Sequence, residues 1–221
     1  MATSACEDQP IPTIGLDLGE MFPERSDWYW KYNHDEFSEV SYWHNRGLTT
    51  PAGAEWITYR FWVADEQGII EDIADGDPSS WDLEIFWEEQ SNGWYLRGWS
   101  ANPEGPSAHL GTQIFEEGVP FALSNVPASG ATWTASAGGV DWVTTAFREM
   151  TELQFNGQVI NDAWRIEVAT DDGESVLDSV WWLVNGPGFV QWALPDFRDE
   201  DSVRAWQHVH NDSYDNILGS R

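Results

Sequence analysis

The chain is nearly without cysteine and lysine. Among 221 residues, Cys6 is the only cysteine, and Lys31 is the only lysine beside nine arginines. A single cysteine excludes an intrachain disulfide and a thiolate metal cluster. Neither a disulfide framework nor a cysteine-bound metal can therefore organise this fold.

Long apolar runs are also missing. No stretch approaches the roughly 20 apolar residues that a membrane-crossing helix requires, and no charged-then-apolar signal peptide is present. Residues 1–10, however, place small residues before Cys6 and a polar tether after it, which resembles the cleavage site of bacterial lipoproteins. Thr3 stands where those proteins have an aliphatic residue. The segment predicts a lipid anchor at Cys6, and an ordinary free cysteine is the alternative.

Positive charge is scarce. The chain has 38 acidic and 10 basic residues, with a net charge of −28. Such a charge repels nucleic acids and anionic membranes, so no nucleic-acid partner is expected. It also opposes the compact state unless salt screens the repulsion. The composition favours a salt-adapted protein, with an acidic surface of no special meaning as the alternative.

Aromatic residues, by contrast, are abundant. The 16 Trp, 10 Phe and 6 Tyr argue against disorder, because aromatic side chains bury the most area and suit pleated surfaces. Residues 55–63 and 81–88 alternate apolar with polar side chains, which is the period of a half-buried strand. Asn92-Gly93 predicts a tight hairpin. Arg60, Arg97, Arg148 and Arg165 accompany aromatics on predicted strands, where cation–π stacking or ion pairing explains them.

The two halves of the chain share one plan. Asn92-Gly93 and Asn185-Gly186 lie 93 positions apart, as do Trp99 and Trp192. We predict an all-β fold of antiparallel sheets from two similar five-stranded halves, as a half barrel or sandwich, with one short C-terminal helix. The alternative is chance similarity between two Trp-rich halves. The predicted divisions are a flexible tether (1–20), a first β repeat (21–100), a linker with a possible short strand (101–117), a second β repeat (118–195), and a short helix with a frayed tail (196–221).

The predicted helix follows Pro195. Residues 199–202 supply capping side chains, and Val203, Trp206 and Val209 are spaced to form an apolar stripe. His208 and His210 are the only paired histidines. On a strand they would share a face and could bind zinc, whereas on a helix they would diverge.

The aromatic strands resemble a family. Residues 22–32 and 123–134 each place a proline before a Trp-containing strand, and 181–192 close with an aromatic strand, a glycine turn and a last short strand. This pattern is similar to exported bacterial β-domain envelope lipoproteins of unknown role, some with lipoprotein-carrier-type half barrels. The resemblance covers 118–192 best and 21–99 more loosely. It implies the fold and an extracytoplasmic location, in the bacterial envelope or secreted, and supplies no active-site residues.

The tryptophans are the candidate binding residues. Sixteen exceed the usual need of a core this size, so some are expected to line a concave or exposed surface for a sugar or an apolar ligand. Core and cross-strand packing is the alternative for any single one. The candidates are Trp62, Trp87, Trp94, Trp99, Trp182 and Trp192.

A metal site is the second candidate. Asp72, Asp75 and Asp77 surround Gly76 in an acidic loop, which could supply the oxygens that calcium prefers. The spacing does not match the twelve-residue calcium loop, and a solvated acidic loop is the alternative. No cofactor is otherwise expected.

Catalytic motifs are absent. Serine elbows, phosphate loops and dinucleotide fingerprints are missing, and Glu88-Glu89 are adjacent, so they would face opposite sides of a strand rather than act as a pair. The expectation is a non-catalytic secreted or envelope-anchored β protein that binds an apolar ligand or an envelope partner protein. A carbohydrate-binding module with exposed tryptophans and a hydrolase with a cryptic acidic site are the alternatives.

Overall fold

The structure is a computed structural model that describes residues 28–34, 40–64, 81–124, 129–149, 153–155, 158–160, 163–171, 178–184, 188–195 and 205–210, with the backbone alone for some of them. One 3-10 turn, η1 (Ala108–Leu110), accompanies the strands. The strands are β1 (Trp28–His34), β2 (Val40–Thr49), β3 (Trp56–Ala64), β4 (Leu83–Gln90), β5 (Gly93–Ala101), β6 (Thr112–Leu123), β7 (Ala131–Ala137), β8 (Val140–Glu149), β9 (Leu153–Phe155), β10 (Gln158–Ile160), β11 (Ala163–Thr170), β12 (Ser179–Val184), β13 (Gly188–Pro195) and β14 (Ala205–His210). The predicted all-β class is confirmed.

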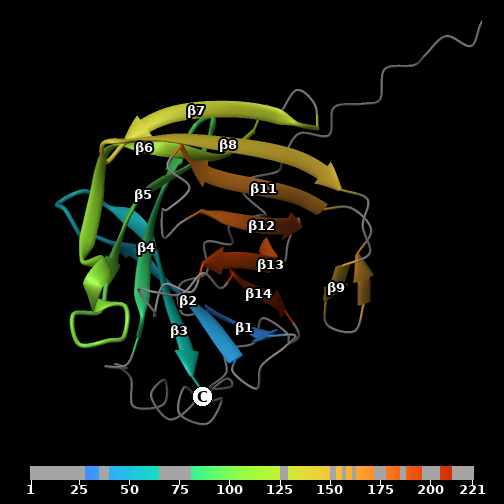
Figure 1. Cartoon of the computed structure of the whole chain (residues 1–221), viewed down its shortest axis with the longest axis horizontal. Helices are drawn as coiled ribbons and strands as arrows, with labels where there is room; N and C mark the ends of the chain where they lie inside the picture. Colours follow the sequence, from blue (N-terminus) through green and yellow to red (C-terminus); the bar gives the residue numbers. More distant parts are fainter. Residues whose placement is uncertain are drawn as a thin grey trace, which may run out of the picture.

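Twelve strands form one antiparallel sheet in the order β6-β5-β4-β3-β2-β1-β14-β13-β12-β11-β8-β7. From β1 to β6, consecutive strands are neighbours in the sheet. The second run of neighbours is β7-β8-β11-β12-β13-β14. The pairing of β1 with β14 joins these two meanders. Strands β9 and β10 form a separate hairpin beside the sheet (Figure 1).

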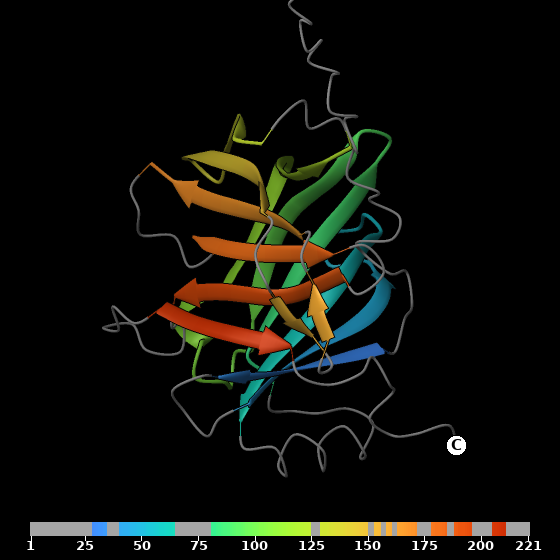
Figure 2. The ribbon, with the colours of Figure 1, turned by 90° about the vertical axis from the view of Figure 1, so that its right-hand side faces the viewer.

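The sheet curls so that its two halves face each other. Strands β11 to β14 cross in front of the strands of the first half at a steep angle (Figure 2). The inner face carries the aromatic core, in which Trp43 lies 5.7 Å from Trp181 and Phe61 lies 5.2 Å from Trp192, measured between ring centroids. The alternating strands predicted from the sequence therefore bury their apolar faces against each other.

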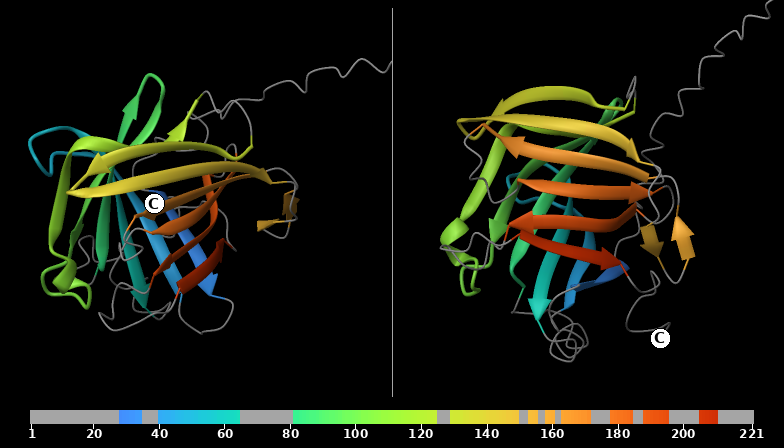
Figure 3. Two further views of the ribbon diagram at one scale, coloured as in Figure 1. Left: turned by 45° about the horizontal axis from the view of Figure 1, so that its top comes forward. Right: turned by 45° about the vertical axis from the view of Figure 1, so that its right-hand side comes forward.

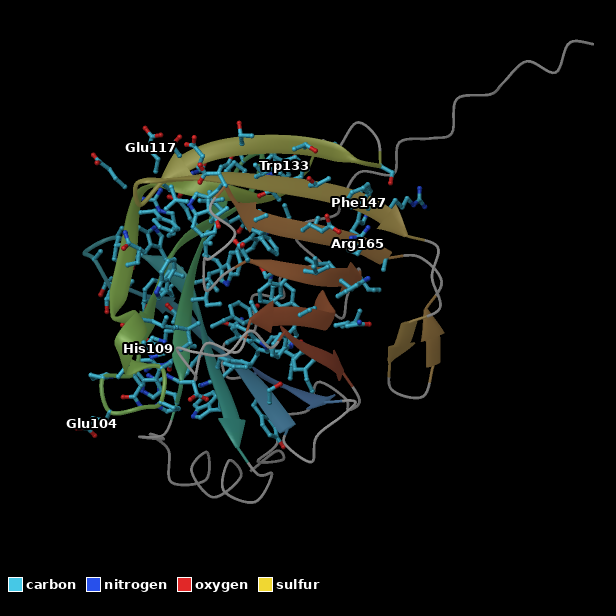
Figure 4. The ribbon with its side chains drawn as sticks, in the orientation of Figure 1. Glu104, His109, Glu117, Trp133, Phe147 and Arg165 are labelled. Atoms are coloured by element: carbon cyan, nitrogen blue, oxygen red, sulfur yellow. The ribbon has the colours of Figure 1, made fainter. Side chains whose placement is uncertain are left out.

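The curled sheet does not close. Among the described residues, the edge strands β6 and β7 share no backbone ladder, although they come close at the top of the molecule (Figure 3). Two side chains bridge the seam instead: Trp133 Nε1 and Thr144 Oγ1 donate to the Pro120 carbonyl oxygen at 2.8 and 2.7 Å. Trp133 is labelled on β7 in Figure 4. Proline cannot donate to a ladder, which suits Pro120 to an edge strand.

The predicted divisions can be placed on this topology. The hairpin predicted at Asn92-Gly93 joins β4 to β5, with Gln90 opposite Gly93. The predicted boundary between 117 and 118 falls inside β6, which pairs with β5. The tether 1–20 lies outside the described residues.

The predicted C-terminal helix is wrong where the structure describes this segment. Residues 205–210 form β14, which pairs with β13 on one side and with β1 on the other. Hydrogen bonding to two neighbouring strands outweighs the weak helical preference of a six-residue segment. In the described part of the chain, no helix is long and apolar enough to span a bilayer.

Candidate binding cavity

A cavity of about 500 Å³ opens where β2 and β4 end and β3 begins. Its volume lies within the range of small-molecule sites. The described residues that line it are Asn45, Gly47, Leu48, Glu55, Trp56, Ile57, Trp87, Glu88 and Glu89. Three consecutive strands therefore supply one continuous wall.

Irregular pairing accompanies the hollow. The β2–β3 register shifts between Asn45 and Leu48, and the β4–β5 register shifts between Phe86 and Trp87. Gly47 adopts a φ of 71° in the first irregularity, and its amide donates to Asn45 Oδ1 at 2.8 Å. A bulge bends its strand and redirects side chains. These two bulges lie at the positions where the wall is formed.

The wall is largely apolar. Trp56 and Trp87 are buried, at 4% and 2% exposure, and Ile57 packs against the core. Leu48 is 65% exposed and is the one large hydrophobic side chain exposed among the described residues. The apolar part of the lining thus ranges from buried tryptophans to the exposed Leu48, which an apolar ligand could cover.

Carboxylates supply the polar part of the lining. Glu55 and Glu89 are exposed, while Glu88 Oε2 lies 3.7 Å from Arg97 Nη1. The Arg97 guanidinium also lies 4.8 Å from the Trp56 ring centroid. Among the described lining residues, three are acidic and none is basic. The cavity therefore favours a ligand with a positive group.

A second polar cluster lies on the other face of β2 to β4, away from the aromatic core. Glu84 Oε1 accepts hydrogen bonds from Arg46 Nη1 at 2.7 Å and from Arg60 Nε at 2.9 Å. The His44 ring stacks on Trp62 with centroids 6.0 Å apart. We call His44, Arg46, Arg60, Trp62 and Glu84 the outer cluster. Glu84 thus pairs with both arginines of the outer cluster and partly compensates their charge.

Among the residues whose side chains are described, two ionisable groups have strongly shifted pKa values. Burial, together with the positive charges of Arg46 and Arg60, lowers the pKa of His44 from 6.5 to about 3. Burial raises the pKa of Tyr59, which lies in the aromatic core. His44 is therefore neutral at physiological pH. Neither group lines the cavity.

The six predicted tryptophans lie in four different surroundings. Trp87 lines the cavity. Trp94 and Trp192 are wholly buried in the core, and Trp99 packs against it. Trp62 is buried in the outer cluster, and Trp182 packs against Val190 and Ala163 on another surface. The structure therefore does not bring the six together, and no tryptophan whose side chain it describes is exposed.

Sequence reasoning missed most of the cavity. Trp56, Ile57 and Leu48 were not predicted as binding residues, because strand alternation says nothing about where a ladder is interrupted. Gly47 was the available signal, since glycine inside a strand marks a bulge. Glu88 and Glu89 both line the cavity although they are adjacent, so their place at a strand end matters more than the face that each prefers.

The predicted cation–π contacts are confirmed for Arg60, Arg97 and Arg165, the last of which lies 4.4 Å from the Phe147 ring centroid (Figure 4).

The predicted calcium ligands and the predicted lipid anchor lie in segments that the structure does not describe. Asp72, Asp75, Asp77 and Cys6 lie outside the described residues. Within the described part of the chain, no group of three His, Cys, Asp or Glu side chains is arranged to hold a metal. The backbone at His208 and His210 is a strand, which is the condition under which the sequence predicted that the two share a face.

Comparisons with known proteins give no relative. No family model, no curated protein and no solved structure matches the chain.

Proposed function

We propose that this protein binds a small, partly apolar molecule that carries a positive charge, in the cavity between the ends of β2, β3 and β4. The single observation that carries the proposal is the cavity of about 500 Å³, whose lining combines apolar side chains with three glutamates. The role is binding rather than catalysis, in keeping with the absence of a catalytic motif from the sequence.

The shape and chemistry of the wall support a compact aromatic cation. The apolar side chains of the lining offer contact area for an apolar ring, chiefly at the exposed Leu48. Glu55 and Glu89 form no ion pair seen among the described residues, so their charge is available to a ligand. The net charge of −28 also attracts cations from solution toward the protein. Anionic ligands of the same shape are repelled by the glutamates of the lining and by the net negative charge of the protein.

The carbohydrate alternative has less support. A sugar-binding surface needs exposed aromatic faces, whereas Trp62, Trp94 and Trp192 are buried at 1% exposure or less. The cavity wall holds two tryptophans, and both are also buried. A soluble glycan is therefore the negative control in the test below.

A charge-matched series of ligands tests the proposal. We expect naphthylmethyl-trimethylammonium to bind with one-to-one stoichiometry by calorimetry, more tightly than naphthalenemethanol, with naphthylacetate and a soluble glycan not binding. The Glu55→Gln/Glu89→Gln double variant should lower the affinity for the cation by about tenfold, equal to ~1.4 kcal/mol, and leave the neutral analogue unchanged.

Glu117→Gln is the matched control, because Glu117 is exposed on β6 and does not line the cavity (Figure 4). Leu48→Ala should weaken the cation and the neutral analogue alike, since it removes apolar area from the rim. Equal binding of cation and anion, or no effect of either the glutamate or the leucine substitution, would contradict the proposal.

A further inference from the structure

The pairing of β1 with β14 brings three histidines together that lie far apart in the sequence. His34 is directly opposite His208, and Tyr32 is directly opposite His210. His34 is isolated in the sequence, and only the pairing of β1 with β14, the first and last described strands along the chain, brings it close to His208 and His210. All five histidines of the chain are at 34, 44, 109, 208 and 210, and three of them meet at this one strand pair.

The backbone register assigns the three positions to one face. Residues directly opposite in an antiparallel pair share a face, and so do residues two apart on one strand. His34 and His208 are opposite, and His208 and His210 are two apart. Typical spacings are about 4.5–5.5 Å between the Cβ atoms of an opposed pair and roughly 7–8 Å for a diagonal pair, still within reach of long or aromatic side chains.

The shared face is the one that carries the aromatic core. Tyr32 is opposite His210 on β1, and Trp192 is opposite His208 on β13. Tyr32 and Trp192 are both wholly buried, and their rings meet edge to face with centroids 5.9 Å apart. The three backbone positions therefore lie next to one another on the core face of the β1–β14 pair.

From this juxtaposition we propose that His34, His208 and His210 form a three-histidine site for a zinc-type divalent transition metal between β1 and β14. Three imidazoles with a fourth position left for water are one of the recognised zinc ligand sets. Imidazole also selects zinc, copper and nickel over calcium and magnesium, which prefer oxygen ligands. The ion would link β1 and β14, the first and last described strands along the chain. The site does not depend on the ligand cavity, whose lining residues come from β2, β3 and β4 and the turn before β3.

Cobalt substitution tests the site in the full-length protein. The protein is stripped with a chelator and titrated with Co²⁺ in excess Mg²⁺, which occupies the many carboxylates. We expect one equivalent of Co²⁺ to give the intense visible bands of four-coordinate nitrogen ligation, and Zn²⁺ to displace it. The bands should disappear as the pH falls below about 6.5, because the ligating imidazoles must be deprotonated.

Single substitutions then assign the ligands. We expect about 100-fold or greater loss of Co²⁺ affinity in each of three variants, His34→Gln, His208→Gln and His210→Gln. Removing a direct ligand should cost at least as much as removing a residue that only hydrogen-bonds to a ligand, which costs about 10–100-fold. His109→Gln is the control, since His109 is exposed in η1 and should leave the affinity unchanged. Three variants that bind Co²⁺ as tightly as the unaltered protein would overturn the proposal, as would only the weak bands of oxygen ligation.

A measurement on the unaltered protein covers the case in which a variant does not fold. X-ray absorption of the zinc-loaded protein should show three imidazole nitrogens at about 2.0–2.1 Å. A shell of oxygen atoms alone would mean that zinc binds to surface carboxylates, and would overturn the site.

Discussion

At the scale of single residues, the outer cluster combines a buried arginine, its carboxylate partner and a neutral histidine. Glu84 receives both Arg46 and Arg60 on one oxygen, and Arg60 also lies 5.0 Å from the Trp81 ring centroid. The Arg60 side chain is 8% exposed, so its charge depends on Glu84 for compensation. His44 must remain neutral beside these two cations, and that requirement makes the fold sensitive to acid.

Stability should fall in acid because of His44. Its pKa is about 3 in the folded protein against 6.5 ordinarily. As the pH drops below 6.5, His44 becomes protonated in the unfolded chain and stays neutral in the folded protein. The free energy of unfolding therefore falls by about 1.4 kcal/mol for each pH unit until the pH approaches 3. We expect His44→Gln to be less acid-sensitive than the unaltered protein by about 2 kcal/mol between pH 7 and pH 5. Urea unfolding at both pH values measures this.

The control for this experiment is His109→Gln, because His109 is exposed. Its loss of stability between pH 7 and pH 5 should equal that of the unaltered protein. If His44→Gln also lost stability in parallel with the unaltered protein, acid sensitivity would come from other groups, and a neutral buried His44 would be contradicted.

At the scale of elements, the sequence predicted hairpins well and the last strand badly. Alternation over residues 55–63 and 81–88 and the turn before Gly93 were sufficient to predict β3, β4 and β5, because each pairs with its neighbour in the chain. Residues 205–210 were predicted as helix from the spacing of Val203, Trp206 and Val209. Their partner β1 is at the opposite end of the sequence, so no local pattern could reveal the pairing.

Glycine at position 98 is required by the close approach of β5 and β6. Gly98 has a φ of 128°, and a Cβ built there would collide with the backbone carbonyl of Gln113. Since the obstacle is backbone, relief requires the two strands to separate. We expect Gly98→Ala to destabilise the protein by about 3 kcal/mol or more, measured by chemical unfolding.

Gly139→Ala separates the collision from the backbone conformation. Gly139 has a φ of 85°, yet nothing lies within 4 Å of a Cβ at this position. It should therefore lose only about 1 kcal/mol, from the left-handed conformation alone. Equal losses in the two variants would show that strand separation is not the cause.

At the scale of the whole molecule, the tryptophans serve the packing of one half against the other. Trp87 lies 4.7 Å from Phe121 and 6.3 Å from Trp181 between ring centroids, so rings from both meanders share one core. Their excess over a normal core was read in the sequence as a ligand surface. Two aromatic faces that pack against each other need large side chains on both sides, and the sequence could not show that the halves would meet in this way. The cavity escaped prediction because its wall depends on bulges.

The charge of the molecule predicts how its stability depends on salt. With 38 acidic against 10 basic residues, the net electrostatic interaction among the charged groups is repulsive. Raising the salt from about 0.01 M to 1 M shortens the screening length from roughly 30 Å to 3 Å. We expect this to add about 2 kcal/mol of stability, or a rise of about 4–8 °C in Tm for a chain of this size. Thermal unfolding followed by circular dichroism measures the change.

The identity of the salt decides whether screening is the cause. Sodium chloride and choline chloride should raise Tm equally at equal ionic strength, because screening depends on charge alone, whereas sulfate adds a further rise by strengthening apolar burial. The ion pairs of Glu84 oppose the effect only weakly, since that carboxylate is 14% exposed and buried pairs are little screened. A Tm that is constant in chloride salts would mean that the acidic surface does not strain the fold, and the salt-adapted interpretation of the composition would be contradicted.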